Sequence, residues 1–243
     1  MSVEITQLAI GPARATVAVP SKPTGVGVLL YPTIFGVNPP MLGFAGELAA
    51  LGMTVIVWDP YRGEPVGSSV PEVVERSKRC EDDAAVEDLV TLCDHARTEM
   101  GVVAVGGVGW CFGGRMGLLH AGLDHRVSVL CTYNPTMLSV TPVAVAGVGV
   151  ISRADSPGQT MDEFAHARRI VGAVQMTRPE HDFTQPAEYD ALRDALFARG
   201  DPTFYEYYPA TDHGFSYMPG PANERSHKLA WSRTLSLLAG LGG

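Results

Sequence analysis

A cysteine flanked by glycines is the first feature that could carry chemistry. Cys111 is the central residue of the run VGWCFGG at 108–114, which follows an apolar segment and precedes one that can form a helix. Glycine-x-nucleophile-x-glycine between strand and helix is typical of a nucleophile elbow, where side chains at the glycine positions would collide with neighbouring strands. The pattern predicts Cys111 as a nucleophile, with the backbone amide of Phe112 directed at the same point. The alternative is a buried cysteine in a tight turn.

A cysteine nucleophile needs a base, because an ordinary thiol has a pKa of about 8.5 and is mostly protonated at neutral pH. Of the seven histidines, His213 follows the apolar and aromatic segment 203–208, in the run TDHGF. This places it in a loop at the carboxyl end of a predicted strand, the edge of an open α/β sheet where ligands bind. We therefore predict His213 as the base. The alternative is a solvent-exposed loop histidine.

An acid that orients the base is expected between Cys111 and His213, since folds with this elbow follow the order nucleophile, acid, histidine. Two carboxylates follow the predicted strand at 170–176, Glu180 and Asp182. Asp182 lies four residues before Pro186, where the next helix is expected to begin, and it is preferred on that spacing. Glu180 remains the alternative acid, and either carboxylate could instead cap a loop.

Metal, cofactor and nucleic-acid functions are not indicated. The sequence has no Cys-x-x-Cys or His-Glu-x-x-His pattern, and its glycine cluster lacks the Lys-Ser/Thr of a phosphate-binding P-loop. The formal net charge of −8 argues against nucleic acid or an anionic membrane as a partner. We predict no metal, no cofactor and a small-molecule substrate as the partner. A monomer and a weak dimer both remain open.

Five short apolar runs predict the strands that must position these residues. They occupy residues 25–31, 53–58, 102–109, 127–133 and 170–176. None alternates polar with apolar residues, as is expected of parallel strands covered on both faces. Helical periodicity is found at 82–97, at 186–199 and from Asn223 to before Gly240. The predicted fold class is therefore α/β, with a mostly parallel central sheet and helices on both faces.

Two segments stand apart from this alternation. The first twenty residues predict two short strands around Gly11 and Pro12, as an antiparallel edge. Residues 134–160 contain three prolines and no clear period, which predicts a long loop or lid-like connection. The length of 243 residues suits one domain spanning 1–243. Because the chain has neither a signal-peptide pattern nor an apolar run of about 20 residues, we expect a cytoplasmic protein.

Three motifs together resemble the dienelactone hydrolase family. They are YPTIFGVN at 31–38, GWCFGG at 109–114 and YPATDHGF at 208–215, and the resemblance extends from residue 3 to residue 240. Members of that family are α/β-hydrolases with a Cys-Asp-His triad that open cyclic enol-lactones. The resemblance implies the α/β-hydrolase fold for this chain.

Carried over by position, the resemblance implies Cys111 as the nucleophile, His213 as the base and Asp182 as the acid. It also implies an oxyanion hole formed by the backbone N–H groups of Ile34 and Phe112.

Two positions depart from the family's pattern. Thr33 stands where the family typically has a glutamate implicated in activating the thiol. The residues from His213 to Tyr217 include no arginine at the position that holds a substrate carboxylate in the family's lactone hydrolases, although Arg76 or Arg79 could supply such a contact. Dienelactone is therefore not the expected substrate. The expected substrate-pocket residues are Thr33, Trp110, Tyr133, Tyr217 and Arg79.

The residues and the resemblance predict a cysteine hydrolase of a small lactone, ester or similarly activated acyl compound. One alternative is a catalytically weak binding or regulatory protein on the same fold. Another is a triad enzyme that cleaves a carbon–carbon or amide bond.

Overall fold

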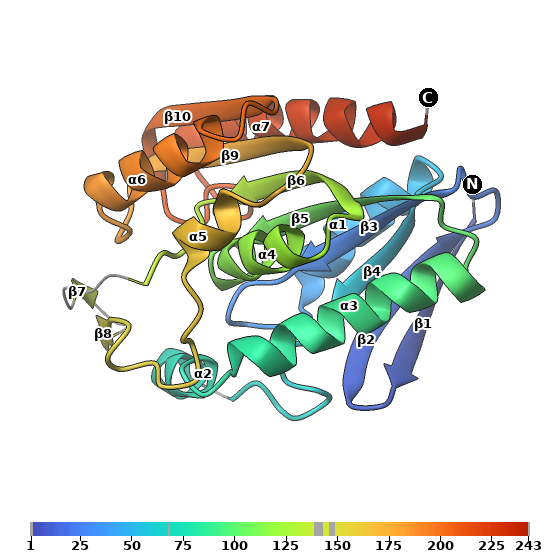
Figure 1. Ribbon diagram of the computed structural model, residues 1–243, viewed down its shortest axis with the longest axis horizontal. Coiled ribbons are helices and arrows are strands. Elements are labelled where there is room, and N and C mark those ends of the chain that lie inside the picture. Colours follow the sequence, from blue (N-terminus) through green and yellow to red (C-terminus); the bar gives the residue numbers. More distant parts are fainter. Residues whose placement is uncertain (1, 68, 139–142, 146–148, 243) are drawn as a thin grey trace.

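An eight-stranded sheet forms the centre of the computed structural model, which describes residues 2–67, 69–138, 143–145 and 149–242 (Figure 1). The strand order is β1-β2-β4-β3-β5-β6-β9-β10. The pairs β1–β2 and β2–β4 are antiparallel, and the pairs from β4–β3 to β9–β10 are parallel. The strands are β1 (Val3–Ile10), β2 (Ala13–Pro20), β3 (Val26–Tyr31), β4 (Thr54–Trp58), β5 (Ala104–Trp110), β6 (Val127–Tyr133), β9 (Ala173–His181) and β10 (Thr203–Asp212).

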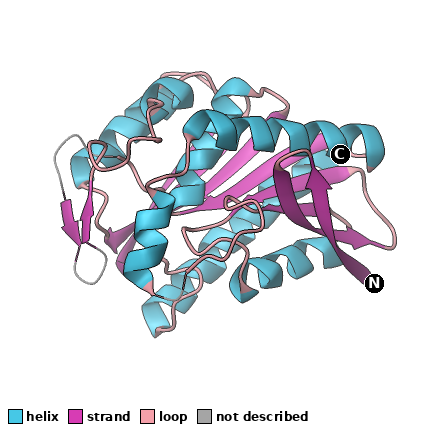
Figure 2. Cartoon of the chain, turned by 90° about the horizontal axis from the view of Figure 1, so that it is seen from below, coloured by secondary structure: helices cyan, strands magenta, loops and turns pink. Residues whose placement is uncertain are grey.

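Helices cover both faces of this sheet (Figure 2). Buried side chains of α1 and α7 pack against one face, and those of α3, α4 and α6 pack against the other. The helices are α1 (Pro39–Ala50), α2 (Val70–Ser77), α3 (Asp82–Glu99), α4 (Phe112–Leu123), α5 (Glu163–Ala167), α6 (Pro186–Phe197) and α7 (Pro221–Ala239), followed by a short 3₁₀ turn at Gly240–Gly242. The predicted α/β class is confirmed.

Strand β3 shows why the central strands are apolar throughout. Its side chains point alternately to opposite faces of the sheet, as in any strand. Leu29 and Tyr31 pack in the core beneath α3 and α4, whereas Val28 and Leu30 pack in the core beneath α1 and α7. Because both faces are covered, neither set can be polar, and the period-two pattern of a half-exposed strand is absent.

The boundaries differ from the sequence predictions in several places. Strand β9 lies at Ala173–His181 rather than 170–176, and β10 continues through Asp212. Helix α7 begins at Pro221, not after a cap at Asn223, because proline is well suited to the first turn of a helix. The side chain of Asn223 instead donates to Asp212 at the end of β10 (3.2 Å). The predicted antiparallel strands at the N-terminal edge are confirmed.

The connection at 134–160 contains a short hairpin rather than only a loop. Strands β7 (Val143–Val145) and β8 (Gly149–Ile151) pair antiparallel, and Figure 1 shows them at the end of the molecule where α2 and α5 also lie. Residues 139–142 and 146–148 of this predicted lid-like connection lie outside the described residues. Within the part of the chain that the structure describes, no helix is long and apolar enough to cross a membrane.

A buried ionic network ties the end of this connection to the helix that follows Cys111. Arg115 on α4 donates two hydrogen bonds to Asp82 at the start of α3 (2.6 and 2.8 Å), and both side chains are at most 1% exposed. Arg115 also contacts Glu163 (3.4 Å), which accepts from Arg153 (2.6 Å) and from the amide of Leu138 (2.9 Å). The start of α4 is thereby held to α3 and α5.

Asp82→Asn is expected to lower the free energy of unfolding by about 3–5 kcal/mol, because it leaves the buried Arg115 charge with an incomplete set of partners. Urea denaturation measures this change. Arg193→Ala is the control, since Arg193 pairs with Asp190 and Asp194 at the surface, and it should change stability by less than about 0.5 kcal/mol. Equal losses for the two variants would contradict the role given to the network.

Candidate active site

The turn at Cys111 is a strained strand-to-helix junction. Cys111 follows β5, precedes α4 and has φ 55° and ψ −120°, a conformation that L-residues rarely adopt. A Cβ at Gly109 would lie 2.5 Å from the carbonyl oxygen of Gly113, and one at Gly113 would lie 2.0 Å from that of Tyr31. Both positions therefore require glycine, as the sequence pattern predicts for an elbow.

The thiol of Cys111 is in an environment unlike that of the other cysteines. Its Sγ lies 3.2 Å from Oγ1 of Thr136, and the residue is 8% exposed. Burial alone would raise the pKa of Cys111, but the charge of His213, with hydrogen bonds from His213, Thr136 and the amide of Phe112, lowers it below that of an ordinary thiol. By contrast, burial raises the pKa to about 12 for three other thiols: Cys80, Cys93 and Cys131.

His213 and Asp182 form a hydrogen-bonded pair whose carboxylate is buried. Nδ1 of His213 lies 3.0 Å from Oδ1 of Asp182, whose side chain is 3% exposed. Asp182 also accepts from the hydroxyl of Tyr189 (2.8 Å) and from the amide of Thr184 (2.9 Å), so both of its oxygens are engaged. Burial lowers the pKa of His213, but the neighbouring charges of Cys111 and Asp182 outweigh it and raise this pKa to about 10. Because Nδ1 is bound to the carboxylate, Nε2 is the ring nitrogen that remains to interact with the thiol.

Glu180, the alternative acid, lies outside this arrangement. Its side chain is 46% exposed and accepts from the amide of Ala210 (2.7 Å) on β10. The geometry thus pairs Asp182 with His213, whereas Glu180 caps a local irregularity between β9 and β10.

A tight turn after β3 faces the thiol. The amide of Gly36 donates to the carbonyl oxygen of Thr33 (2.9 Å), and the amide of Phe35 donates to the Thr33 hydroxyl (3.2 Å). The hydroxyl of Tyr61 donates to the carbonyl oxygen of Ile34 (2.5 Å), which fixes the middle of the turn. Thr33 is 2% exposed, and its side-chain hydroxyl accepts from the backbone amide of Phe35. This residue therefore stabilises the turn and supplies no titratable group.

A pocket of about 160 Å³ joins these elements. Cys111, His213, Thr33, Ile34 and Phe112 line it, as does Tyr217, one of the expected pocket residues. Most of its wall is apolar, contributed by Phe35, Val70, Val74, Leu138 and Phe183. The structure thus brings the predicted nucleophile, base and oxyanion-hole residues to one cavity.

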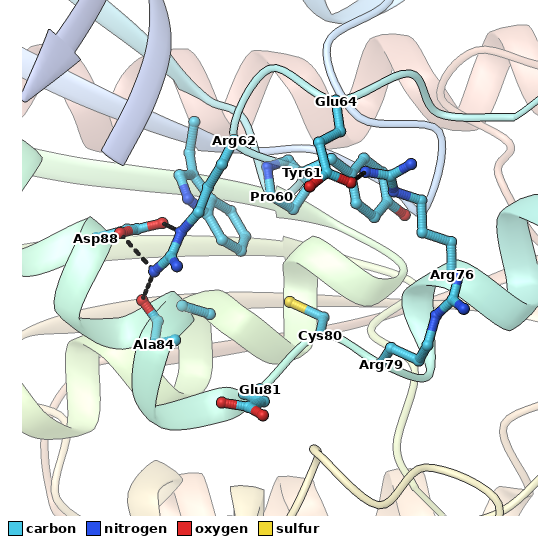
Figure 3. A pocket seen from close by; sticks show the side chains of 12 residues that line it. Pro60, Tyr61, Arg62, Glu64, Arg76, Arg79, Cys80, Glu81, Ala84 and Asp88 are labelled. Atoms are coloured by element: carbon cyan, nitrogen blue, oxygen red, sulfur yellow. Dashed lines mark hydrogen bonds and ion pairs between the residues drawn. The ribbon is translucent and has the colours of Figure 1, made fainter. Parts of the chain in front are cut away.

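Three of the expected pocket residues lie elsewhere. Trp110 and Tyr133 are fully buried and pack against each other in the core beneath α1 and α7, with ring centroids 5.6 Å apart, so placing them in the pocket was wrong. Arg79 lines a second pocket of about 450 Å³, together with Arg76 and Tyr61 (Figure 3). Helix α2 lies between the two pockets. Val70 and Val74 line the pocket that contains Cys111, whereas Arg76 lines the second pocket.

Sequence reasoning missed three residues that contact the candidate triad: Asn134, Thr136 and Tyr189. Asn134 and Thr136 follow β6, the neighbour of the elbow strand, so the rule that groups gather at the carboxyl ends of parallel strands could have identified them. Tyr189 lies on α6, and the helical periodicity predicted for that segment does not indicate its hydrogen bond to Asp182. Within the described residues, no group of three or more His, Cys, Asp or Glu side chains is placed to hold a metal ion.

The sheet order, the elbow after β5 and the histidine loop after β10 define an α/β-hydrolase fold. The sequence matches the dienelactone hydrolase family over residues 13–241, and the chain belongs to that family. It is accordingly a hydrolase. No curated protein matches the sequence closely enough to extend the comparison.

Solved structures show the same fold at low sequence identity. A proposed dienelactone hydrolase from Klebsiella pneumoniae is 20% identical, with a TM-score of 0.77, and the match covers 98% of this chain and 99% of that one. A dienelactone hydrolase-like promiscuous phosphotriesterase from metagenomic libraries is 17% identical (TM-score 0.66; 99% and 98% covered). An acylaminoacyl peptidase from Pyrococcus horikoshii is 14% identical (TM-score 0.74), with 98% of this chain but 42% of the peptidase covered.

Proposed function

We propose that the chain is a cysteine-nucleophile hydrolase of small, uncharged esters or lactones. The observation that carries the proposal is the contrast among its thiols. The pKa of Cys111 alone among the four cysteines is lowered, and it is lowered by a histidine that is itself bound to a buried carboxylate. A purely structural cysteine needs neither partner.

The reaction would proceed in two halves. In the first, the proton of the Cys111 thiol passes to Nε2 of His213, the sulfur attacks the carbonyl carbon, and the proton then passes to the departing alkoxide. In the second, His213 takes a proton from water as the water oxygen attacks the thioester carbonyl carbon, the C–S bond then breaks to release the carboxylic acid, and the sulfur takes the proton back from His213. The carbonyl oxygen would accept from the amides of Phe112 and Ile34, and donors of this kind stabilise the transition state by about 3–4 kcal/mol each.

The pocket wall indicates the substrate class. Among the described residues no arginine lines the cavity that contains Cys111, and Lys78 at its wall is paired with Glu75 (2.6 Å). Burying a carboxylate against an apolar wall without a partner is costly. The volume of about 160 Å³ favours a short acyl group.

A matched pair of esters tests the proposal. Para-nitrophenyl butyrate and mono-para-nitrophenyl succinate have acyl chains of equal length and differ in a terminal carboxylate. We expect kcat/KM to be at least about tenfold higher for the butyrate, a difference of about 1.4 kcal/mol. Intact-mass analysis of enzyme quenched during turnover should show a butyryl group on Cys111. Absence of turnover and of the adduct, with a panel of lactones and thioesters included, would favour the alternative of a binding protein, and a preference for the succinate would overturn the substrate class.

A further inference from the structure

Three hydrogen bonds hold the turn after β3 and leave the backbone amide of Ile34 free. The Gly36 amide donates to the carbonyl oxygen of Thr33 (2.9 Å), and the Phe35 amide donates to the Thr33 hydroxyl (3.2 Å). The carbonyl oxygen of Ile34 accepts from the hydroxyl of Tyr61 (2.5 Å). Within the described residues the amide of Ile34 donates to no acceptor, and Ile34 lines the cavity that contains the thiol. This N–H is therefore available to an oxygen atom of a bound ligand.

Of these three hydrogen bonds, only that of Tyr61 comes from outside the turn. Tyr61 follows β4, the strand that lies beside β3 in the sheet, and is 6% exposed. Its ring packs against Gly36, where an added Cβ would lie 3.3 Å from Cδ2 of the tyrosine. Burial raises the pKa of Tyr61, so the hydroxyl stays protonated and remains a donor.

The ring of Tyr61 is itself held by α2. The guanidinium carbon of Arg76 lies 4.6 Å from the ring centroid, a cation–π arrangement. Nη2 of Arg76 donates to Glu64, three residues after Tyr61 (2.6 Å; Figure 3). All three side chains line the second pocket. The turn that borders the cavity of the thiol is thus anchored from the neighbouring cavity.

The peptide group between Ile34 and Phe35 is bound at both ends. Its carbonyl oxygen accepts from Tyr61, and its N–H donates to Thr33. Because a peptide group is planar, these two hydrogen bonds define its orientation. The preceding peptide group, which contains the Ile34 N–H, shares the α-carbon of Ile34 with it. A rotation of one group in a closed turn has to be compensated by the other, so the hydroxyl of Tyr61 also restrains the direction of the free N–H.

We propose that Tyr61 is a positioning residue for the oxyanion hole, whose hydroxyl holds the carbonyl oxygen of Ile34 and thereby keeps the Ile34 amide directed at the reacting oxygen. This inference rests on the proposed function, which makes that amide a donor to the oxyanion. In the step concerned, an electron pair of the Cys111 sulfur forms the S–C bond, the carbonyl π pair moves onto the oxygen, and His213 holds the proton of the thiol. No covalent bond of Tyr61 changes.

Tyr61→Phe tests the role, since it deletes the hydroxyl and keeps the ring that packs against Arg76. Tyr133→Phe is the matched control, because it deletes another buried tyrosine hydroxyl, bonded to Thr234 (2.7 Å) in the core beneath α1 and α7. The first readouts are kcat and KM for para-nitrophenyl butyrate and the pH dependence of Cys111 alkylation by iodoacetamide.

The remaining readout is the dissociation constant of propyl trifluoromethyl ketone, measured as protection of Cys111 from alkylation. This ketone has the chain length of the butyryl group. Addition of the Cys111 thiolate to its carbonyl carbon forms an S–C bond and converts the carbonyl oxygen to an oxyanion, so the adduct resembles the tetrahedral intermediate of ester cleavage.

We expect Tyr61→Phe to lower kcat about 10- to 100-fold and to change KM by less than about twofold, because a displaced donor weakens the transition state more than the bound ester. The dissociation constant of the ketone should rise by a similar factor. The pH at which alkylation reaches half its maximal rate should not move, because iodoacetamide is attacked at a saturated carbon and forms no oxyanion. Tyr133→Phe should leave every readout within about twofold of the wild type.

An unchanged kcat or an unchanged dissociation constant of the ketone in Tyr61→Phe would overturn the inference. A shift in the pH dependence of alkylation, or an equal loss of kcat in Tyr133→Phe, would also overturn it, because either result would indicate a general effect on packing.

The ketone measurement requires no ester turnover. A wild-type protein that binds the ketone covalently but hydrolyses no ester would refute the proposed function, while the dissociation constants would still decide the role of Tyr61. A wild-type protein that neither hydrolyses esters nor forms the adduct would overturn both.

Discussion

Replacing Cys111 with alanine is expected to lower kcat for para-nitrophenyl butyrate by about 10⁴-fold or more and to leave the melting temperature nearly unchanged. The loss follows from the proposed mechanism, in which the sulfur of Cys111 forms the acyl intermediate, so that its removal leaves only the contribution of binding and the oxyanion hole. Stability should persist because the side chain is small and alanine tolerates the φ of 55° no worse than cysteine does. Ester hydrolysis assays and thermal denaturation measure the two effects.

Cys80→Ser provides the matched control. Cys80 lines the second pocket and its pKa is raised to about 12, mainly by burial, so its loss should change kcat by less than about twofold. Cys111→Ala enzyme that retains turnover would refute the assignment of the nucleophile. A large loss of stability in that variant would instead indicate a structural thiol.

Asp182→Asn should lower kcat by about 10³- to 10⁴-fold. The carboxylate of Asp182 lies 3.0 Å from Nδ1 of His213 and would favour the tautomer with the proton on that nitrogen, whereas an asparagine amide in its place would favour the opposite tautomer, in which Nε2 cannot accept the thiol's proton. The Asp182 charge is also one cause of the raised pKa of His213, so its loss should lower that pKa. The pH at which Cys111 reacts with iodoacetamide at half its maximal rate should then increase, because a neutral His213 no longer stabilises the thiolate. Steady-state kinetics and the iodoacetamide profile together measure both consequences.

Glu180→Gln distinguishes the two carboxylates. Its side chain is half exposed and bonded to the backbone of Ala210, so we expect kcat within about twofold of the wild type. If Glu180→Gln produced the larger loss, the pairing seen between Asp182 and His213 would not be the one used in turnover.

The sequence was informative wherever backbone geometry dictates residue type. Glycine at 109 and 113 follows from contacts below 3 Å that a Cβ would make, so the elbow could be located without a structure. Asp182 was preferred as the acid because it precedes Pro186 by four residues in the sequence, and Pro186 does begin α6. In these cases a local constraint that can be recognised in the sequence also determines where the residue lies in the fold.

Side-chain direction was where prediction failed. Trp110 and Tyr133 are close to the elbow in sequence, but strand alternation turns both to the opposite core. Arg79 is near the pocket along the chain, yet it lies on the far side of α2. The contacts of Asn134 and Thr136 depend on β6 lying beside β5, an adjacency that no local pattern specifies. The polar residues that contact Cys111 and His213 could therefore be identified only from the three-dimensional structure.

The close packing of Gly113 against the end of β3 has a consequence for how this enzyme could change over time. An added methyl group there would lie 2.0 Å from the carbonyl oxygen of Tyr31 and 2.3 Å from that of Pro32, the residues that lead directly into the Thr33–Gly36 turn. The spacing between sulfur and turn is thus set by main chain touching main chain. Substitutions in the pocket walls can therefore change which molecules fit while the position of the Cys111 sulfur relative to this turn is kept.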